Sequence, residues 1–333
     1  MSERIDRLRA ATRSSAYLNG GTVDRLIAGF IHPERGVVVT GFWRSGTTFL
    51  LERLTQMLRG KPLFEPFQPE LPSYQAIVDA ARPAAVASKD FDAYFMPYAM
   101  TDAMAGYIDR VLRYRIVDQR IQRSRTNLTA HGRRPTGVPA LAMQQWLALR
   151  TSVVVKFVRA SLLIPALRRC FAGPVFHIRR QPYGVLASFK TADWSAFQPA
   201  RISLRRLLLD IDDGRAAFFA PWQRVIDALD RGDAWRRLMG YWALTERFVD
   251  AHAEHYTILS YEALATGELD LADCLARQGL FPSSSASASF NSSTTSAHRA
   301  HLSARERAEG WRDVLSQAEI DTVDDVVDRV YSV

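Results

Sequence analysis

The segment 41–48, with the sequence GFWRSGTT, contains the residue types and spacing best suited to binding an anion. Gly41 and Gly46 enclose four residues, as the glycines of a Walker A phosphate loop do. Backbone N–H groups of such a turn converge on a phosphate or sulfate, and the two threonines that follow add hydroxyl groups. Arg44 lies inside the turn, where its guanidinium can contact a terminal or bridging oxygen. The segment therefore predicts an anion site.

The flanking residues predict the strand and the helix that such a turn requires. Residues 36–41, GVVVTG, form a β-branched apolar run that is typical of a buried parallel strand. Residues 47–59, TTFLLERLTQMLR, have apolar positions at helical spacing. Strand, turn and helix in this order open a βαβ unit, and the helix N-terminus adds its dipole to the anion site.

One position departs from the Walker A pattern. The lysine that reaches the β- and γ-phosphates is replaced by Thr47, and the nearest lysine downstream is Lys61. The loop therefore lacks a group that binding of a nucleoside triphosphate with Mg²⁺ requires, whereas binding of a phosphosulfate requires only the turn and one cation. A P-loop kinase that acts on a small hydroxyl compound is the alternative enzyme.

In this context GFWRSGTTFLLERL resembles the 5'-phosphosulfate loop of the sulfotransferases that use 3'-phosphoadenosine 5'-phosphosulfate (PAPS). In having an arginine at position 44, the loop resembles those of the carbohydrate and tyrosylprotein branches of that family. The resemblance, over roughly residues 36–315, implies a P-loop α/β fold and sulfuryl transfer from PAPS to a hydroxyl acceptor, with no metal required. It implies that the adenine stacks on Phe49 and that the phosphosulfate is bound by Arg44, Ser45, Gly46, Thr47 and Thr48.

A second element of the family binds the 3'-phosphate through an arginine at a strand end and a serine eight residues later. The segment FHIRRQPYGVLASFK supplies Arg180 and Ser188 at this spacing, although Gln181 stands where the family has an acidic residue. An arginine fork and a helix hydroxyl suit a phosphate. Arg179 is the alternative if the register differs by one, and a purely structural arginine pair is the interpretation without a ligand.

Two further segments resemble parts of the family near the nucleotide. YTILSYEAL at 256–264 resembles a strand that ends in Tyr-Glu, which implies that Tyr261 lies beside the nucleotide; a core tyrosine is the alternative. RERAEGWR at 305–312 resembles the C-terminal basic loop over the 3'-phosphate, which implies a contact from Arg305, with Arg307 as a second basic residue. A solvated helix face is the alternative for this segment.

Sulfuryl transfer needs cations near the developing charge and a base for the acceptor hydroxyl. Lys156 ends an apolar run, where a lysine is costly unless it meets an anion. Cytosolic relatives place a histidine base two residues later, but Val158 stands there. Tyrosylprotein and carbohydrate relatives have a glutamate about 21 residues after the loop cation, which implies Glu65 as the base, with Glu70 as the fallback. A strand-end lysine and a capping glutamate are the structural alternatives.

The rest of the chain predicts an α/β fold with a mainly parallel sheet flanked by helices. Further strands are expected at 152–158, 174–180 and 256–261, and helices at 162–170 and 183–190. Residues 66–150 and 201–250 are predicted to be helical insertions that cap the sheet's C-terminal edge and bind the acceptor. The serine-rich stretch 283–299 predicts a mobile loop. We expect one domain over residues 1–333.

Charge and composition do not specify a single class of binding partner. The net charge is +8 and only four of the 43 basic residues are lysines, which suits phosphate, sulfate or an acidic or glycan acceptor. An arginine-rich composition is the plain interpretation. The non-enzyme alternative, a basic nucleotide- or nucleic-acid-binding module, would use Arg110, Arg113, Arg115, Arg120, Arg123, Arg125, Arg133 and Arg134; the enzyme hypothesis predicts no nucleic-acid partner.

Two cysteines and seven histidines without metal-ligand spacing predict neither a disulfide framework nor a metal site. His177 is expected in the core, and nothing assigns a role to His131. The first 20 residues lack the apolar core of a signal peptide, and no apolar run approaches the ~18 residues of a membrane span. A cytoplasmic protein is therefore expected. The acceptor, whether glycan, tyrosine or natural product, and the oligomeric state are not predicted.

Overall fold

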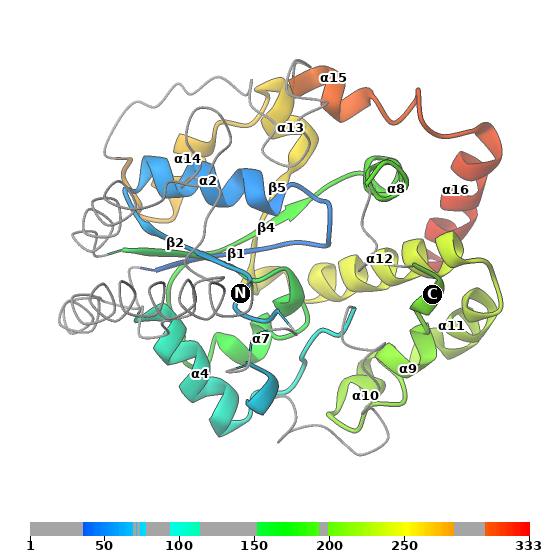
Figure 1. The fold of residues 1–333 in the computed structure, drawn as a ribbon, viewed down its shortest axis with the longest axis horizontal. Helices are drawn as coiled ribbons and strands as arrows, with labels where there is room; N and C mark the ends of the chain where they lie inside the picture. The colour runs from blue at the N-terminus through cyan, green and yellow to red at the C-terminus, as the bar shows by residue number, and fades with distance from the viewer. Residues whose placement is uncertain are drawn as a thin grey trace, which may run out of the picture.

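The computed structural model of the chain describes residues 36–68, 71, 74–77, 94–113, 152–192, 199–282 and 304–333. At its centre lies a sheet of five parallel strands in the order β2-β3-β1-β4-β5 (Figure 1). In β1, Val38 pairs with Val155 on one side and with Val175 on the other. The strands are β1 (Val37–Thr40), β2 (Lys61–Phe64), β3 (Val153–Lys156), β4 (Val175–Arg179) and β5 (Thr257–Ser260).

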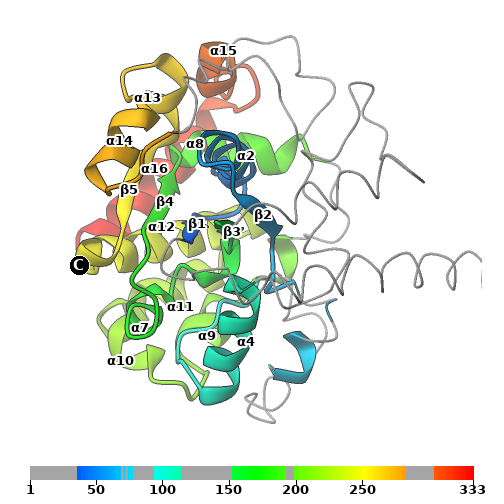
Figure 2. The same ribbon diagram turned by 90° about the vertical axis from the view of Figure 1, so that its left-hand side faces the viewer.

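The valines of β1 alternate between the two faces of the sheet, and all of them are buried. Val37 and Val39 belong to a core cluster with α2 (Thr47–Met57), α13 (Tyr261–Thr266) and α14 (Leu271–Arg277). Val38 belongs to the cluster on the opposite face, with α4 (Asp102–Leu112) and α7 (Ile164–Leu167). Figures 1 and 2 show these two groups of helices on opposite sides of the sheet.

A third core cluster lies among helices beside the sheet, and it includes Phe42 and Trp43 from the loop after β1. Because both rings are buried there, they fix this loop against the helices. α15 (Ala304–Glu309) packs on α13 through Ala308 and Ala265. The helices of the third cluster are α8 (Pro182–Lys190), α9 (Leu204–Leu208), α10 (Arg215–Phe219), α11 (Gln223–Asp230), α12 (Ala234–Ala251) and α16 (Gln317–Tyr331); short 3₁₀ turns lie at Val158–Ala160, Pro199–Arg201, Ala220–Trp222 and Ala253–His255.

The four predicted strands and the predicted helices α2 and α8 are confirmed within one or two residues at each end. α7 is shorter than the predicted helix 162–170, because residues 162–163 before it and 168–170 after it form turns. β2 was not predicted. Of the predicted insertions, 201–250 is largely helical, whereas most of 66–150 lies outside the described residues, apart from α4 and its surroundings. The serine-rich stretch 283–299 also lies outside them.

The chain leaves β1 and β4 in opposite directions across the sheet. From β1 it runs through α2 to β2, and from β4 it runs to β5 at the other edge. The carboxyl ends of β1 and β4 therefore form a topological switch point, where open α/β sheets bind their ligands. The anion loop predicted at 41–48 starts at this point. None of the described helices is long and apolar enough to cross a membrane.

Candidate functional site

Loop 41–48 is a tight turn that depends on its two glycines. Gly41 has φ 153° and Gly46 has φ 96°. A Cβ atom on Gly41 would lie 2.5 Å from the Ile178 carbonyl oxygen, and one on Gly46 would lie 2.6 Å from Cδ2 of Tyr261. Arg44 also has a positive φ of 69°, which costs a non-glycine residue about 1 kcal/mol and is found most often at functional sites.

The turn leaves the N-terminus of α2 open to an anion. Gly46 is the N-cap, no side chain among the described residues caps this end, and the first turn contains no acidic residue. The hydroxyl of Ser45 is fully buried and has no hydrogen-bond partner within the part of the chain that the structure describes. Uncapped N–H groups and an unsatisfied buried hydroxyl are both costly, and a bound phosphate or sulfate would satisfy them.

Two contacts that cross each other join this loop to the segment after β4. Nε of Arg44 donates a hydrogen bond to Oγ of Ser188 in α8, at 2.9 Å. Nη1 of Arg180 donates to the backbone carbonyl of Arg44, at 3.1 Å. These contacts bring together Arg44, Arg180 and Ser188, which lie up to 144 positions apart in the chain. The three residues are those predicted to bind the two ends of a phosphosulfate nucleotide.

Tyr261, the first residue of α13, lies against the same loop. The guanidinium carbon of Arg180 lies 4.7 Å from the centre of its ring, and the ring of Phe49 meets it edge-on at 6.5 Å. The C-terminal segment also approaches, because α15 packs on α13 and Trp311 stacks on Tyr183 of α8 at 4.6 Å. The side chains of Arg305 and Arg307 lie outside the described residues.

Lys156 and Glu65 form a buried ion pair at the other side of the loop. Nζ of Lys156 lies 3.0 Å from Oε1 of Glu65 and donates to Oγ1 of Thr48, also at 3.0 Å. The ammonium group lies 3.7 Å above the ring of Phe64. Lys156 is 4% and Glu65 5% exposed, so each charge depends on the other for compensation. The sequence prediction of Lys156 as a strand-end residue is confirmed.

The second carboxylate oxygen of Glu65 faces a turn that sequence reasoning did not single out. Oε2 accepts a hydrogen bond from the backbone N–H of Val158 at 3.3 Å and lies 3.8 Å from Nη1 of Arg159. An arginine in the apolar run VVVKFVRASLLI was the available signal, because a charged residue in such a run is buried only with a partner.

Five strand ends therefore present one candidate residue each, in the order of the sheet. Glu65 follows β2, Lys156 ends β3, Arg44 follows β1, Arg180 follows β4 and Tyr261 follows β5. Because parallel strands lie about 4.8 Å apart, a ligand along this edge meets the carboxylate at one end and the tyrosine at the other.

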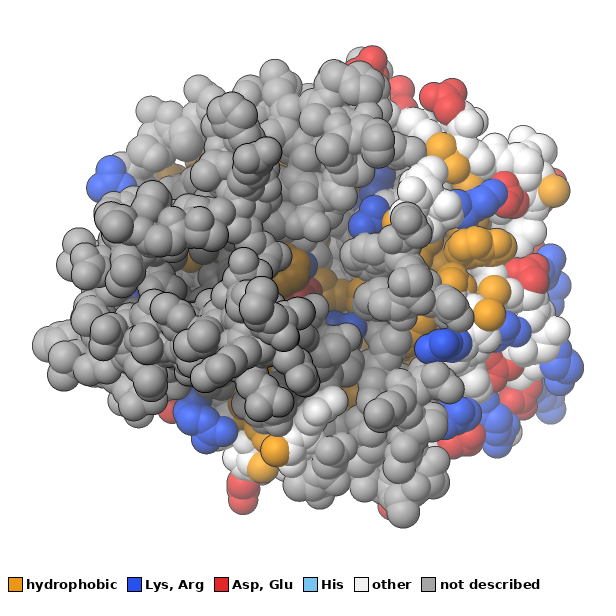
Figure 3. All heavy atoms as spheres, in the orientation of Figure 1, with side chains coloured by type: hydrophobic (Ala, Val, Ile, Leu, Met, Phe, Trp, Pro, Cys, Tyr) orange, Lys and Arg blue, Asp and Glu red, His pale blue; other side chains and the backbone are white. Residues whose placement is uncertain are grey.

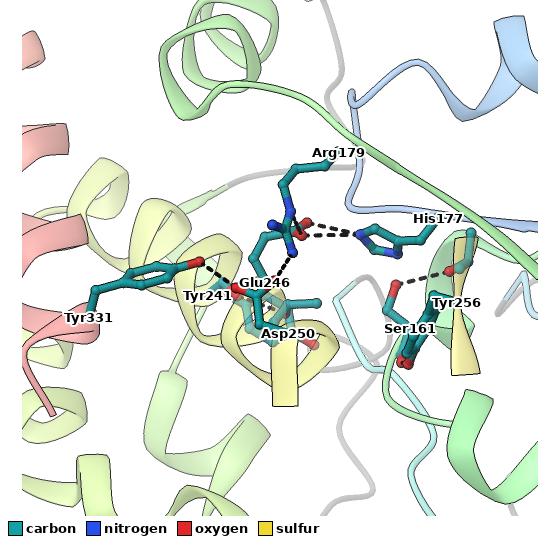
Figure 4. Close-up of polar contacts among 10 residues, drawn as sticks. Ser161, His177, Arg179, Tyr241, Glu246, Asp250, Tyr256 and Tyr331 are labelled. Atoms are coloured by element: carbon teal, nitrogen blue, oxygen red, sulfur yellow. Dashed lines mark hydrogen bonds and ion pairs between the residues drawn. The ribbon is translucent and has the colours of Figure 1, made fainter. Parts of the chain in front are cut away.

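Arg179, the register alternative to Arg180, points away from the loop (Figure 4). Its Nε donates to Glu246 and its Nη2 to Asp250, both at 2.6 Å, and Nε2 of His177 lies 3.1 Å from the same Glu246 carboxylate. Burial lowers the pKa of Arg179, but the charges and hydrogen bonds of Glu246 and Asp250 outweigh it and raise the pKa above its ordinary value. His177 is fully buried, as predicted.

Several of the described surface arginines are paired with carboxylates. On the right of Figure 3, basic and acidic side chains are interspersed. Arg205 contacts Asp227 at 2.9 Å and Arg236 contacts Asp325 at 3.0 Å. Arg113, from the predicted nucleic-acid cluster, pairs with Asp109. The members of that cluster from 115 onward lie outside the described residues, as do Glu70 and His131.

Four cationic side chains, Arg44, Lys156, Arg159 and Arg180, thus lie along one edge of the sheet, with Glu65 as the carboxylate in contact with two of them. Clustered cationic side chains attract an anionic ligand. Among the residues that the structure describes, no group of three or more His, Cys, Asp or Glu side chains could hold a metal ion. A scan against protein-family models finds no match, and searches of curated proteins and of solved structures find none either.

Proposed function

We propose that the protein transfers the sulfuryl group of PAPS to a hydroxyl acceptor. The observation that carries the proposal is the order of residues along the sheet edge, with the Arg44–Ser188 and Arg180–Arg44 contacts at its centre. Two anion-binding arginines from the loops of β1 and β4 suit a nucleotide with charge at both ends. The Lys156–Glu65 pair beyond them suits a reaction at one of those ends.

In this proposal the 5'-phosphosulfate is bound by the N–H groups of loop 41–48 and by the hydroxyls of Ser45, Thr47 and Thr48. Arg180 and Ser188 bind the 3'-phosphate, and Arg305 is a further candidate for it. Phe49 and Tyr261 supply aromatic surface for the adenine. The tight glycine turn, the uncapped helix end and the buried Ser45 hydroxyl fit such a ligand.

The reaction forms one bond and breaks one. The acceptor oxygen attacks sulfur, the bond from sulfur to the 5'-phosphate oxygen breaks, and adenosine 3',5'-bisphosphate leaves with that electron pair. The acceptor proton passes to Glu65. Arg44 and Lys156 stabilise the charge that develops on the sulfuryl oxygens and the leaving phosphate. The products are the sulfate ester, the bisphosphate and a proton.

The acceptor is proposed to bind against the helical insertions 66–150 and 201–250. In α4, Tyr107 donates a hydrogen bond to the carbonyl of Pro66, the residue after Glu65, and α9–α12 share a core cluster with the loop residues Phe42 and Trp43. A glycan, a tyrosine or a natural-product hydroxyl would each suit the proposed base, and an acidic acceptor would suit the basic composition.

Binding and turnover test the proposal separately. Thermal unfolding is followed with adenosine 3',5'-bisphosphate, with ATP–Mg²⁺ and with duplex DNA. We expect the bisphosphate to raise Tm most, by mass action on the folded state. Stabilisation by ATP–Mg²⁺ alone would favour a kinase, and stabilisation by DNA alone a nucleic-acid-binding module. An acceptor screen with radiolabelled PAPS then identifies the hydroxyl compound, and label transfer to none of the three acceptor classes would count against the enzyme.

A further inference from the structure

Glu65 is held from two directions by different groups. Its backbone has φ 51°, a left-handed conformation that costs a glutamate about 1 kcal/mol, and its side chain is buried. Oε1 contacts Lys156 at 3.0 Å, whereas Oε2 contacts the Val158 N–H at 3.3 Å and Arg159 at 3.8 Å. The carboxylate therefore has one cation on each oxygen.

The two cations differ in what else they contact. Lys156 is shared between Glu65 and Thr48 at the start of α2, so its ammonium group already lies at the anion loop. A lysine ammonium is a compact point charge on a flexible chain. When an anion enters the loop, Lys156 can turn toward it and away from Oε1. The Glu65 carboxylate would then keep only one of the two cations that compensate its charge.

Arg159 remains on the other oxygen. It lies in the 3₁₀ turn Val158–Ala160 after β3, is 5% exposed, and its guanidinium carbon is 5.6 Å from the centre of the Trp43 ring. Trp43 in turn packs against Tyr94 and Tyr241 in the core. A planar guanidinium held against a buried ring has little freedom to follow a ligand.

We infer that Arg159 is a positioning residue, which holds the Glu65 carboxylate in its orientation while Lys156 contacts the transferred group. The inference rests on the proposed sulfuryl transfer. Without Arg159, Lys156 would be the single remaining cation for Glu65, and its charge would be divided between carboxylate and sulfuryl oxygens. Turnover would then fall, whereas nucleotide binding through Arg180 and Ser188 would not.

The test compares Arg159→Gln and Arg159→Lys with wild type. We expect Arg159→Gln to lower kcat about 10- to 100-fold, the effect of misplacing a reacting group by about 1 Å. The KM for PAPS and the Kd for adenosine 3',5'-bisphosphate should stay within about threefold, a change worth under 0.7 kcal/mol. Arg159→Lys should recover most of the loss. Arg168→Gln is the matched control, because Arg168 is half-buried and donates to the carbonyls of Gly173 and His255, which precede β4 and β5 at the amino edge of the sheet, opposite to the edge with Glu65.

A double-mutant cycle with Glu65→Gln separates positioning from a general loss of stability. Once the carboxylate is absent, adding Arg159→Gln should lower kcat by less than about threefold, because there is nothing left to position. Multiplicative losses, or a kcat loss in Arg168→Gln equal to that in Arg159→Gln, would overturn the inference. Its failure is distinct from failure of the proposed function, since the latter would show as an inactive wild type.

Discussion

Two adjacent arginines at the end of β4 should respond to substitution in opposite ways. Arg180 lies over Tyr261 and donates to the Arg44 carbonyl, whereas Arg179 lies with Glu246 and Asp250 beside α12. We predict that Arg180→Ala weakens binding of adenosine 3',5'-bisphosphate with little change in stability. Arg179→Ala should lower stability with little change in binding.

The structure sets the size of both effects. Hydrogen bonds to a charged group contribute about 1.5–3 kcal/mol, so losing the Arg180 fork should raise Kd about 10- to 100-fold. Removing Arg179 leaves the fully buried Glu246 with His177. Breaking a buried pair costs about 3–5 kcal/mol, which we reduce to about 2–4 because Arg179 is 30% exposed. With about 0.7 kcal/mol/K of unfolding entropy for this length, Tm should fall about 3–6 °C.

Calorimetric titration and thermal unfolding of both variants measure the two quantities. Each variant is the control for the other, because the substitutions are chemically identical and one position apart. If Arg179→Ala raised Kd as much as Arg180→Ala while leaving Tm unchanged, the assignment of the two side chains to ligand and core would be wrong. If neither substitution weakened binding of adenosine 3',5'-bisphosphate, the end of β4 would not be part of the nucleotide site.

Three further predictions concern the same edge of the sheet. Glu65→Gln should lower kcat on the order of 10²–10⁴-fold while the bisphosphate Kd stays nearly constant; wild-type turnover would exclude this base. Gly46→Ala should abolish bisphosphate binding, measured by calorimetry, and should lower Tm more than Gly267→Ala. Both glycines have positive φ, but a Cβ at position 46 meets Tyr261, whereas one at 267 meets no described atom within 4 Å. Burial raises the pKa of Glu246, but His177 and Arg179 outweigh it and hold the pKa below 4.5. Because the pKa of Glu246 is depressed in the folded state, the stabilisation from its carboxylate is present above pH 4.5 and is lost as the pH falls through the folded-state pKa. The free energy of unfolding, measured with denaturant below pH 4.5, should therefore fall more steeply with pH in wild type than in Glu246→Gln.

Local patterns were sufficient to predict most of the sheet. The run VVVT before loop 41–48 and the helical spacing after it specify strand and helix without help from distant residues. β2 escaped prediction because KPLF begins with a lysine and a proline, both unfavourable in strands. It forms at the edge of the sheet, where a proline is tolerated, by pairing with β3 in parallel from Lys61 to Phe64.

A site residue was predictable where its position at the end of a strand determines that it lies at the carboxyl edge of the sheet. Lys156 and Arg180 come at or after strand ends, so both had to lie at the carboxyl edge of a parallel sheet. The direction of a side chain was not predictable in the same way. Arg179 points to Glu246, 67 positions later in the chain, and only the packing of α12 on the sheet brings them together. The contact of Arg159 with Glu65 likewise depends on the pairing of β2 with β3.

The order of the strand ends separates recognition from chemistry. Arg180 and Tyr261 follow β4 and β5, whereas Lys156 and Glu65 follow β3 and β2, with loop 41–48 between the two groups. At about 4.8 Å per strand, the β2 and β4 ends are three spacings, about 14 Å, apart. A nucleotide that binds across this edge can have its two charged ends held by different strands, and only one end reaches the carboxylate. Substitutions at β4 and β5 should therefore change affinity, and those at β2 and β3 should change turnover, because the described residues of the two groups lie on opposite sides of loop 41–48.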